Sequence, residues 1–134
     1  MWTAFKSLGN FNPDSIRLDF EIAAATSMSA VFGEDVSVWF CLFHLSQNNV
    51  RKICEKHKTR YQNPKESEFA TRCRMVTALA FIPVDDVIET FEELIEFDKN
   101  HEKSPNLLPT DFIKYFEKNY IGKPLRRKTR ETPR

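Results

Sequence analysis

Apolar and polar residues alternate over two short stretches in the first third of the chain, and a helical pattern separates them. Residues 15–20 place an apolar side chain at every second position, which is typical of a β-strand. Residues 21–32 are rich in alanine and repeat an apolar side chain every three or four positions, which predicts a helix that ends at Gly33. Residues 36–41 are β-branched and aromatic, and they predict a second strand.

This order of elements predicts how the two strands pair. Parallel pairing needs a long crossover connection such as a helix, so a strand–helix–strand unit of this length predicts two parallel neighbours. Functional residues on parallel strands are most often found at the carboxyl ends, where the chain turns into a loop or a helix. Asp19 and Cys41 lie at those two ends.

The remainder of the chain predicts helices and no further strand. Apolar stripes at helical spacing recur along it, and we interpret them as core packing. Pro83 suits the first position of a helix, and Thr110 is a favourable cap for the last one. The predicted helices cover residues 2–8, 45–58, 67–80, 83–97 and 111–120. The predicted fold class is α+β and mostly helical.

The composition fits one globular domain. The 134 residues are 41% hydrophobic and 13% aromatic, which is enough for a modest core. No apolar run approaches the roughly 20 residues of a membrane span, and the first residues lack the layout of a signal peptide, so we expect no membrane partner. Cys41, Cys54 and Cys73 make an odd number without disulfide-framework spacing, which favours a reducing compartment, nuclear or cytoplasmic.

The net charge of +1 is unevenly distributed. Residues 122–134 hold six basic residues and one acidic residue, whereas the preceding 121 residues are mildly acidic. Such a basic tail could contact nucleic acid, serve as a nuclear-import signal, or simply keep a terminus solvated. The residues that could contact phosphates are Lys123, Arg126, Arg127, Lys128 and Arg130.

Asp19-Phe20-Glu21 is the first candidate for chemistry. A carboxylate at the carboxyl end of a strand can help to hold Mg²⁺, which usually takes one or two protein carboxylates together with waters and substrate phosphate. The alternative is structural: Asp19 would cap the following helix, and Glu21 would favour its first turn. The residues alone leave both interpretations open.

Cys41-x-x-His44 and Cys54-x-x-His57 together suggest a zinc site, since two cysteines and two histidines are a known structural set. The predicted helix over residues 45–58 argues against this site. Ten residues of helix separate the two pairs by roughly 15 Å, because each residue adds about 1.5 Å. We therefore expect no four-ligand zinc.

The order of several short motifs resembles the Mutator-like (MULE) transposases. The chain has Asn12-Pro13, a strand that ends in Asp19-Phe20-Glu21, a helix that includes Phe32, and then Cys41-Leu-Phe-His44 followed by Leu45 and Gln47. Each motif is weak by itself, and their order and spacing carry the resemblance. The similarity continues through Arg51-Lys-Ile53, Arg74-Met75, Ala78-Leu-Ala-Phe-Ile-Pro-Val84, Val87, Phe91-Glu-Glu-Leu94, Tyr115-Phe116, Tyr120-Ile-Gly122 and the arginine-rich tail.

The resemblance implies an RNase H-like catalytic domain with a DDE triad of two aspartates and a glutamate. It places the second acid, a catalytic residue and metal ligand, at Asp19. Cys41 and His44 match the family's Cys-x-x-His motif and would have a structural or DNA-positioning role. The implied cofactor is Mg²⁺ or Mn²⁺. The implied domains are a partial RNase H-like core at 1–44, a helical insertion at 45–121 and a basic flexible tail at 122–134.

The resemblance places neither the first aspartate nor the final glutamate within these residues. We therefore expect a transposase fragment that does not cut DNA by itself and binds no metal tightly. Its expected partners are DNA, bound weakly and without sequence preference, and either the missing parts of the transposase or another protein chain. Glu21 is not expected to replace a triad member, because it leads into the following helix. The alternative is a transposon-derived module that binds protein or DNA without catalysis.

Overall fold

The computed structural model describes residues 2–9 and 11–122. The chain divides into two compact units, Met1–Asn48 and Asn49–Arg134. Among the described residues the fold is α+β and mostly helical, with a two-stranded sheet. Within this part of the chain, no helix is both long enough and apolar enough to cross a lipid bilayer.

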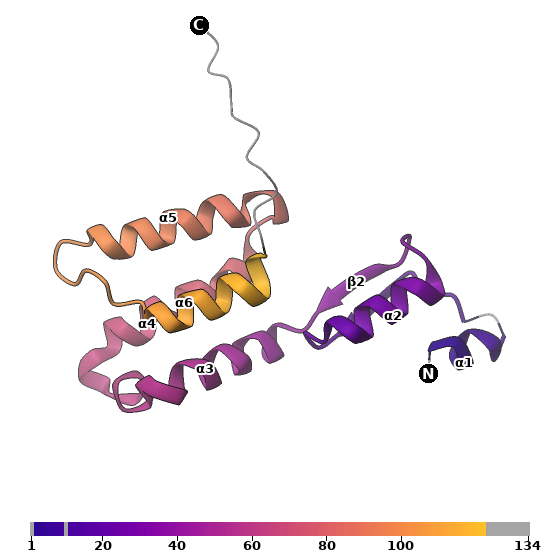
Figure 1. Cartoon of the computed structure of the whole chain (residues 1–134), viewed down its shortest axis with the longest axis horizontal. Helices are drawn as coiled ribbons and strands as arrows, with labels where there is room; N and C mark the ends of the chain where they lie inside the picture. The colour runs from indigo at the N-terminus through magenta and orange to yellow at the C-terminus, as the bar shows by residue number, and fades with distance from the viewer. Residues whose placement is uncertain (1, 10, 123–134) are drawn as a thin grey trace, which may run out of the picture. The chain divides into compact units, whose positions relative to one another are not determined.

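The first unit contains a parallel pair of strands joined by a helix (Figure 1). β1 (Ser15–Leu18) leads into α2 (Ile22–Phe32), and β2 (Ser37–Phe40) follows. The strands pair in register from Ser15 opposite Ser37 to Leu18 opposite Phe40. Gly33 ends α2 with a positive φ of 88°, a conformation that glycine adopts without steric cost, as the sequence predicts. The predicted parallel pairing is confirmed.

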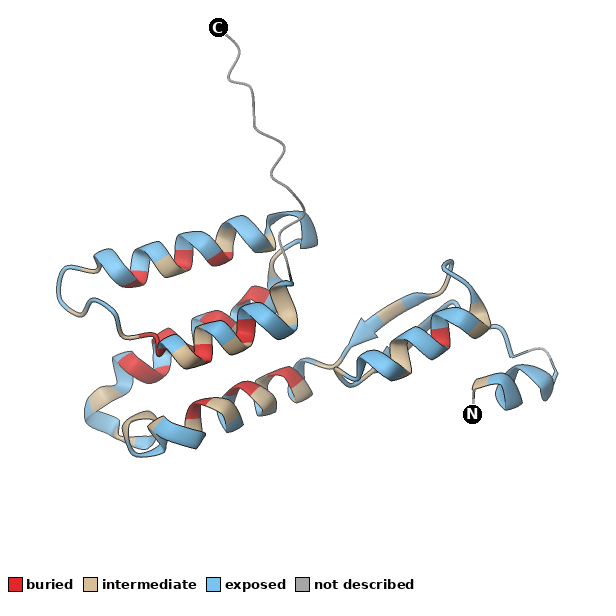
Figure 2. Cartoon of the chain, viewed as in Figure 1, coloured by how far each residue is buried: buried red, intermediate tan, exposed pale blue. Residues whose placement is uncertain are grey.

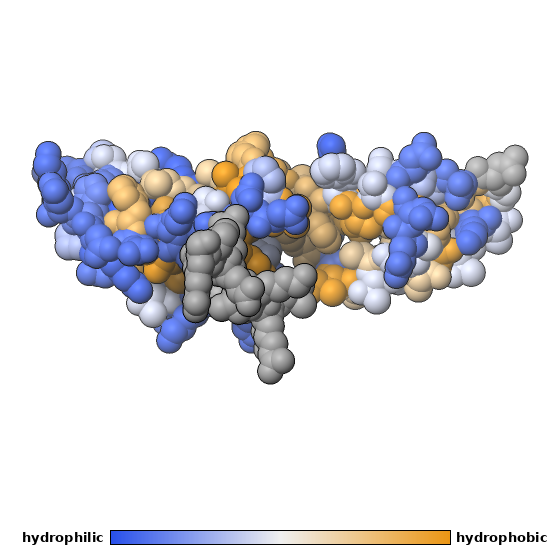
Figure 3. Space-filling model, turned by 90° about the horizontal axis from the view of Figure 1, so that it is seen from above, coloured by the Kyte–Doolittle hydropathy of each residue, from blue (hydrophilic) through white to orange (hydrophobic). Residues whose placement is uncertain are grey.

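Few side chains of the first unit are fully buried (Figure 2). Among its described residues, the buried apolar ones are Met28 on α2 and Leu45. An aromatic cluster joins the short α1 (Trp2–Ser7) to α2, because the rings of Trp2 and Phe11 both contact the ring of Phe32. Large apolar side chains at the surface of this unit include Ile22, Trp39 and Phe43, and Figure 3 shows hydrophobic groups among the hydrophilic ones.

The second unit is built from helices. α3 (Leu42–Gln62) starts directly after β2 and continues into this unit. The later α-helices are α4 (Ser67–Ala78), α5 (Val87–Asn100) and α6 (Thr110–Phe116). Three short 3₁₀ turns, Pro64–Glu66, Leu79–Phe81 and Val84–Asp86, connect them. α6 continues as one π-helical turn, η4 (Glu117–Ile121).

The core of the second unit lies where these helices face one another (Figure 2). Phe116 is central to it, since its ring contacts those of Phe91 and Phe112 at centroid distances of 5.9 and 6.4 Å. The buried apolar residues are Ile53, Phe69, Ala70, Cys73, Val76, Leu79, Phe91, Leu94, Leu108, Phe112 and Phe116. Many positions of the predicted apolar stripes are thus core packing in this unit, but the stripe over residues 83–97 is only partly buried, since Val84 and Ile88 are exposed.

A buried ion pair fastens the loop between α5 and α6. Nη1 of Arg72 donates to Oδ1 of Asp98 at 2.9 Å, and both residues are almost fully buried. The same carboxylate accepts the backbone N–H groups of Leu107 and Leu108 at 3.2 and 3.0 Å. The backbone carbonyl of Asp98 also accepts the N–H of Asn106 at 2.8 Å. Asp98 therefore ties the loop to both α4 and α5.

Some predicted helix ends are wrong. α3 begins at Leu42 and not at residue 45, so His44 lies inside a helix. Pro83 precedes a 3₁₀ turn, and α5 proper begins at Val87. Thr110 is not the cap of α6: Pro109 occupies the cap position, and its carbonyl accepts the N–H of Ile113 at 3.0 Å.

Candidate functional site at the strand ends

The carboxyl ends of β1 and β2 bring Asp19 and Cys41 to the same edge of the sheet. Leu18 and Phe40 are register partners, and Asp19 and Cys41 each follow by one residue. The backbone N–H of Cys41 donates to the carbonyl of Leu18 at 2.8 Å, which fixes the two chain segments beside each other. The strand ends therefore lie together, as the parallel arrangement predicts.

Asp19 occupies a tight turn between β1 and α2. Its carbonyl accepts the N–H of Glu21 at 2.8 Å, and its side chain is exposed. Within residues 2–9 and 11–122 its carboxylate takes part in no hydrogen bond or ion pair. An exposed carboxylate at a strand end is able to bind a hard cation, which coordinates oxygen ligands.

The alternative that Asp19 caps the following helix is wrong. The cap of α2 is Glu21, whose carbonyl accepts the N–H of Ala25 at 3.2 Å. The side chain of Glu21 forms no capping hydrogen bond. Asp19 lies two residues before this cap, so it does not occupy the position from which a side chain satisfies the first N–H groups of a helix.

Cys41 and His44 belong to the junction between β2 and α3. The carbonyl of Cys41 accepts the N–H of Leu45 at 3.2 Å, so Cys41 ends the strand and opens the helix. His44 is half-buried in the first turn of α3, with the ring of Phe43 edge-on at 5.7 Å. Its Nδ1 atom is buried and has no hydrogen-bond partner among the described residues. A buried polar atom without a partner costs free energy, so this atom is a point of unsatisfied polarity at the junction.

Two aromatic rings beside the site were not singled out from the sequence. The ring of Phe20 stacks on that of Phe40 with centroids 4.8 Å apart and planes at 19°. This stacking holds the turn after Asp19 against the last residue of β2. The two residues are 20 positions apart, so only the strand register could have indicated their contact.

The residues proposed for zinc are not gathered in one place. His57 departs from helical geometry and lies against Asp111, with its Nε2 atom 3.1 Å from Oδ1 of that carboxylate. In the described part of the chain, no group of three or more histidine, cysteine or acidic side chains could hold a metal ion. The expectation that the protein binds no stoichiometric zinc remains a prediction, to be measured by metal analysis.

The basic candidates for DNA contact are only partly described. Lys123, Arg126, Arg127, Lys128 and Arg130 lie outside the described residues. On α3, Lys52 pairs with Glu55 at 2.6 Å, and Lys56 lies 3.9 Å from Asp111. Two further cations of this helix, Arg51 and Lys58, are exposed.

Comparisons of the chain with protein-family models, with curated proteins and with solved structures each found no match. The candidate site therefore rests on the geometry of the strand ends and on the order of motifs in the sequence.

Proposed function

We propose that this chain carries part of the RNase H-like catalytic core of a MULE-type DNA transposase, with Asp19 as a catalytic metal ligand. One observation carries the proposal. The exposed carboxylate of Asp19 follows β1 directly, beside Cys41 at the end of the parallel neighbour, and His44 lies in the next helical turn. This placement agrees with the motif order that resembles the family.

The chemistry would be metal-assisted phosphoryl transfer on DNA. Mg²⁺ or Mn²⁺, when bound in such a site, supplies Lewis-acid activation of a phosphate and of the attacking water. Asp19 would bind one ion through its carboxylate. Cys41 would hold the strand end through the hydrogen bond that its backbone N–H donates to Leu18, and His44 would have a structural or DNA-positioning role beside it.

Binding of Mn²⁺ at the strand ends provides the test. Paramagnetic Mn²⁺ added to ¹⁵N-labelled protein should broaden the amide signals near Asp19 and Cys41 before others. Asp19→Asn should abolish this selective broadening, whereas Asp14→Asn should retain it. Asp14 is a matched control because it is an exposed aspartate at the other end of β1. Equal broadening in Asp19→Asn and the parent would refute the metal-ligand role.

Strand cutting is expected to need more than this polypeptide. A two-metal site binds ions about 3.5–4 Å apart, and a single aspartate does not coordinate both. Supercoiled plasmid incubated with the 134-residue protein and Mg²⁺ or Mn²⁺ should therefore remain intact. Nicking that Asp19→Ala abolishes would contradict the expectation that the other triad acids are required.

DNA contact through residues 122–134 is part of the same proposal. About four or five phosphate contacts predict a slope near −4 in a log–log plot of affinity against salt, from roughly −0.9 per phosphate. Deleting residues 123–134 should remove most of the affinity. If the shortened protein binds equally well, the DNA contacts lie elsewhere, with Arg51 and Lys58 of α3 as the next candidates.

The second candidate function is a binding module without catalysis. The observation that favours it is a groove on the helical unit, between α5 and α6 with η4, whose lining combines isoleucines and carboxylates. It involves none of the residues at the strand ends.

A further inference from the structure

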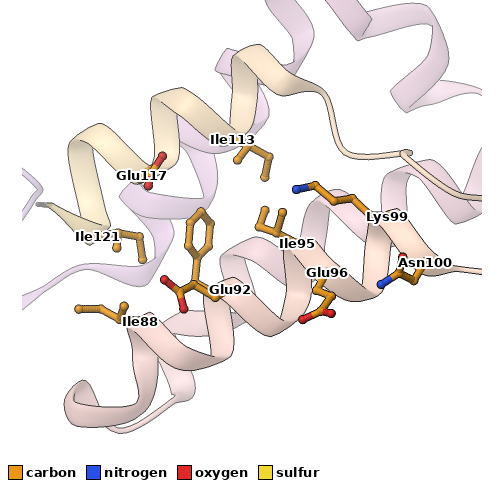
Figure 4. Close-up of a pocket in the computed structure, with 10 residues that line it drawn as sticks. Ile88, Glu92, Ile95, Glu96, Lys99, Asn100, Ile113, Glu117 and Ile121 are labelled. Carbon is orange, nitrogen blue, oxygen red and sulfur yellow. The ribbon is translucent and has the colours of Figure 1, made fainter. Parts of the chain in front are cut away.

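A groove between α5 and the α6–η4 segment lies wholly within the helical unit (Figure 4). Its cavity volume is about 550 Å³, which is within the roughly 300–1,000 Å³ of typical binding pockets. Ile88 and Ile95 point into it from α5, and Ile113 and Ile121 point into it from the other side. Apolar side chains thus converge on an open space.

The floor of the groove is part of the buried core. Phe91 lines it and is 5% exposed, and its ring stacks on that of Phe116 in the core at 5.9 Å. The isoleucines above this floor are only partly covered, and Ile88 is 39% exposed. A concave surface with partly exposed isoleucines is the kind of surface that a partner covers.

The lining has helical spacing on both sides. On α5 the lining residues run from Ile88 to Asn100, a length of about 18 Å at 1.5 Å per residue. On the other side, Ile113, Glu117 and Ile121 are spaced four residues apart. A groove about three helical turns long, with isoleucines on both of its sides, matches an amphipathic helix that presents anchors at i, i+4 and i+7.

The acidic residues of the lining, which form the rim of the groove, favour a partner of positive charge. Glu92, Glu96 and Glu117 line the groove, and among residues 2–9 and 11–122 Lys99 is the one cation in the lining. Glu96 and Glu117 are exposed, and neither forms an ion pair with another residue of the described part of the chain. Exposed carboxylates beside an apolar groove favour basic residues flanking the apolar anchors of a partner.

We infer that this groove binds a basic amphipathic helix of another protein. Its apolar anchors would occupy the space between Ile88, Ile95, Ile113 and Ile121, and its lysines or arginines would pair with Glu96 and Glu117. The inference is independent of the transposase proposal, because it uses no residue of the strand ends and no metal.

The test is peptide binding followed by fluorescence anisotropy. The probe is a labelled 14-residue helical peptide with leucines at positions 4, 8 and 11 and lysines at the flanking positions. A second peptide keeps the leucines and replaces the lysines with glutamates. We expect the full chain to bind the basic peptide at least tenfold more tightly than the acidic peptide.

A pair of matched double variants locates the binding surface. Glu96→Lys with Glu117→Lys reverses two charges on the rim and should weaken basic-peptide binding at least tenfold. The control is Glu89→Lys with Glu93→Lys, which makes the same change in the net charge of the protein. Both positions are exposed on α5 and lie outside the groove lining. This control should change the affinity by less than threefold. Circular dichroism verifies that both variants fold.

Four outcomes would overturn the inference. The first is no binding of the basic peptide, and the second is equal loss of affinity in the two double variants. The third is binding that strengthens at least tenfold when residues 123–134 are deleted, since the chain's own basic tail would then be the occupant. The fourth is a dimer in sedimentation that only the rim variant dissociates, since a second copy would then fill the groove.

Discussion

Replacement of Asp98 tests how the helical unit holds its loop. Asp98→Asn keeps the shape of the side chain and removes the charge that faces Arg72. In the parent, Oδ1 accepts from Arg72 and Leu107 and Oδ2 accepts from Leu108, so the asparagine oxygen can replace only one of the two acceptors. Its NH₂ group then faces the donors of the other, donor against donor. Asp98→Ala removes every acceptor of the side chain. We therefore expect stability to fall from the parent to Asp98→Asn and further to Asp98→Ala.

The expected loss of folding stability follows from the burial of the ion pair. Arg72 is 3% and Asp98 4% exposed, so the charge that remains after Asp98→Ala has little access to water. Breaking such a pair from one side costs about 3–5 kcal/mol when the remaining charge has no other partner. Arg72 keeps an ion pair from its Nη2 atom to Oε1 of Glu68 at 3.1 Å, so the lower end of this range is expected for Asp98→Ala. Asp98→Asn should cost about 2–3 kcal/mol, because one hydrogen bond to the backbone survives. At about 3–5 °C per kcal/mol for a chain of this size, the melting temperature should fall by roughly 6–15 °C in Asp98→Asn.

The distribution of aromatic residues allows the two units to be followed separately. Both tryptophans, Trp2 and Trp39, lie in the first unit. Tryptophan fluorescence therefore reports the first unit, while far-ultraviolet circular dichroism is dominated by the helices of the second. Asp98→Asn should lower the urea midpoint measured by circular dichroism. A double-mutant cycle with Arg72→Leu should give a coupling of about 0.5–3 kcal/mol.

The control is Glu93→Gln, which removes an exposed charge from the same helix and should change stability by less than about 0.5 kcal/mol. Hydrogen exchange at the amides of Leu107 and Leu108 adds a local readout, and both amides should exchange faster in Asp98→Asn. If Asp98→Asn is no less stable than the control and these amides keep their protection, the buried pair does not hold the loop and the reasoning is refuted.

Three further outcomes are expected. Asp19→Asn should leave the melting temperature within about 1 °C of the parent without divalent metal, because the carboxylate of Asp19 has no partner among the described residues for the substitution to remove. A clear loss of stability would make the residue structural. Burial opposes ionisation of Asp111, but the hydrogen bond and charge of His57 hold its pKa below the ordinary value. The stability difference between the parent and Asp111→Asn should therefore shrink as the pH falls below about 4. The exposed control Asp85→Asn should give no such trend. Burial raises the pKa of the Cys73 thiol to about 12, so native protein should alkylate more slowly there than at the other two cysteines, by peptide mapping, and unfolding should remove the difference.

Local patterns allowed most of the elements to be predicted. The alternation over residues 15–20 and the alanine-rich segment that follows gave β1 and α2, because period and chain direction are local properties. Parallel pairing followed from the length of the connection. Helix ends were predicted less well: Thr110 has the chemistry of a cap, yet the carbonyl of Pro109 already accepts the N–H of Ile113 and starts α6 one residue earlier.

Features that depend on distant contacts could not be predicted. Arg72 and Asp98 are 26 residues apart in the sequence. Each is a charged residue in or next to a segment whose apolar positions alone account for a helix with one buried face, so nothing local indicates that the charged residue is buried too. The stacking of Phe20 on Phe40 needs the strand register. The apolar stripe of α5 indicated a buried face, but only the packing of α6 shows that Ile88 and Ile95 remain partly open to the groove.

Asp19 and Asp98 illustrate how the same side chain acquires different roles in this chain. Asp98 is buried and its carboxylate has a cation and two N–H donors, so its charge is already neutralised by the fold. Asp19 is exposed at a strand end and its carboxylate is neutralised by no described residue, so it remains available to an external cation. Neutralising Asp98 should therefore lower the stability of the helical unit and leave Mn²⁺ broadening at the strand ends intact. Neutralising Asp19 should leave the stability unchanged and abolish the broadening. A variant of either residue that changed both properties would mean that the two sites are energetically coupled, and stability could then no longer be separated from metal binding in this protein.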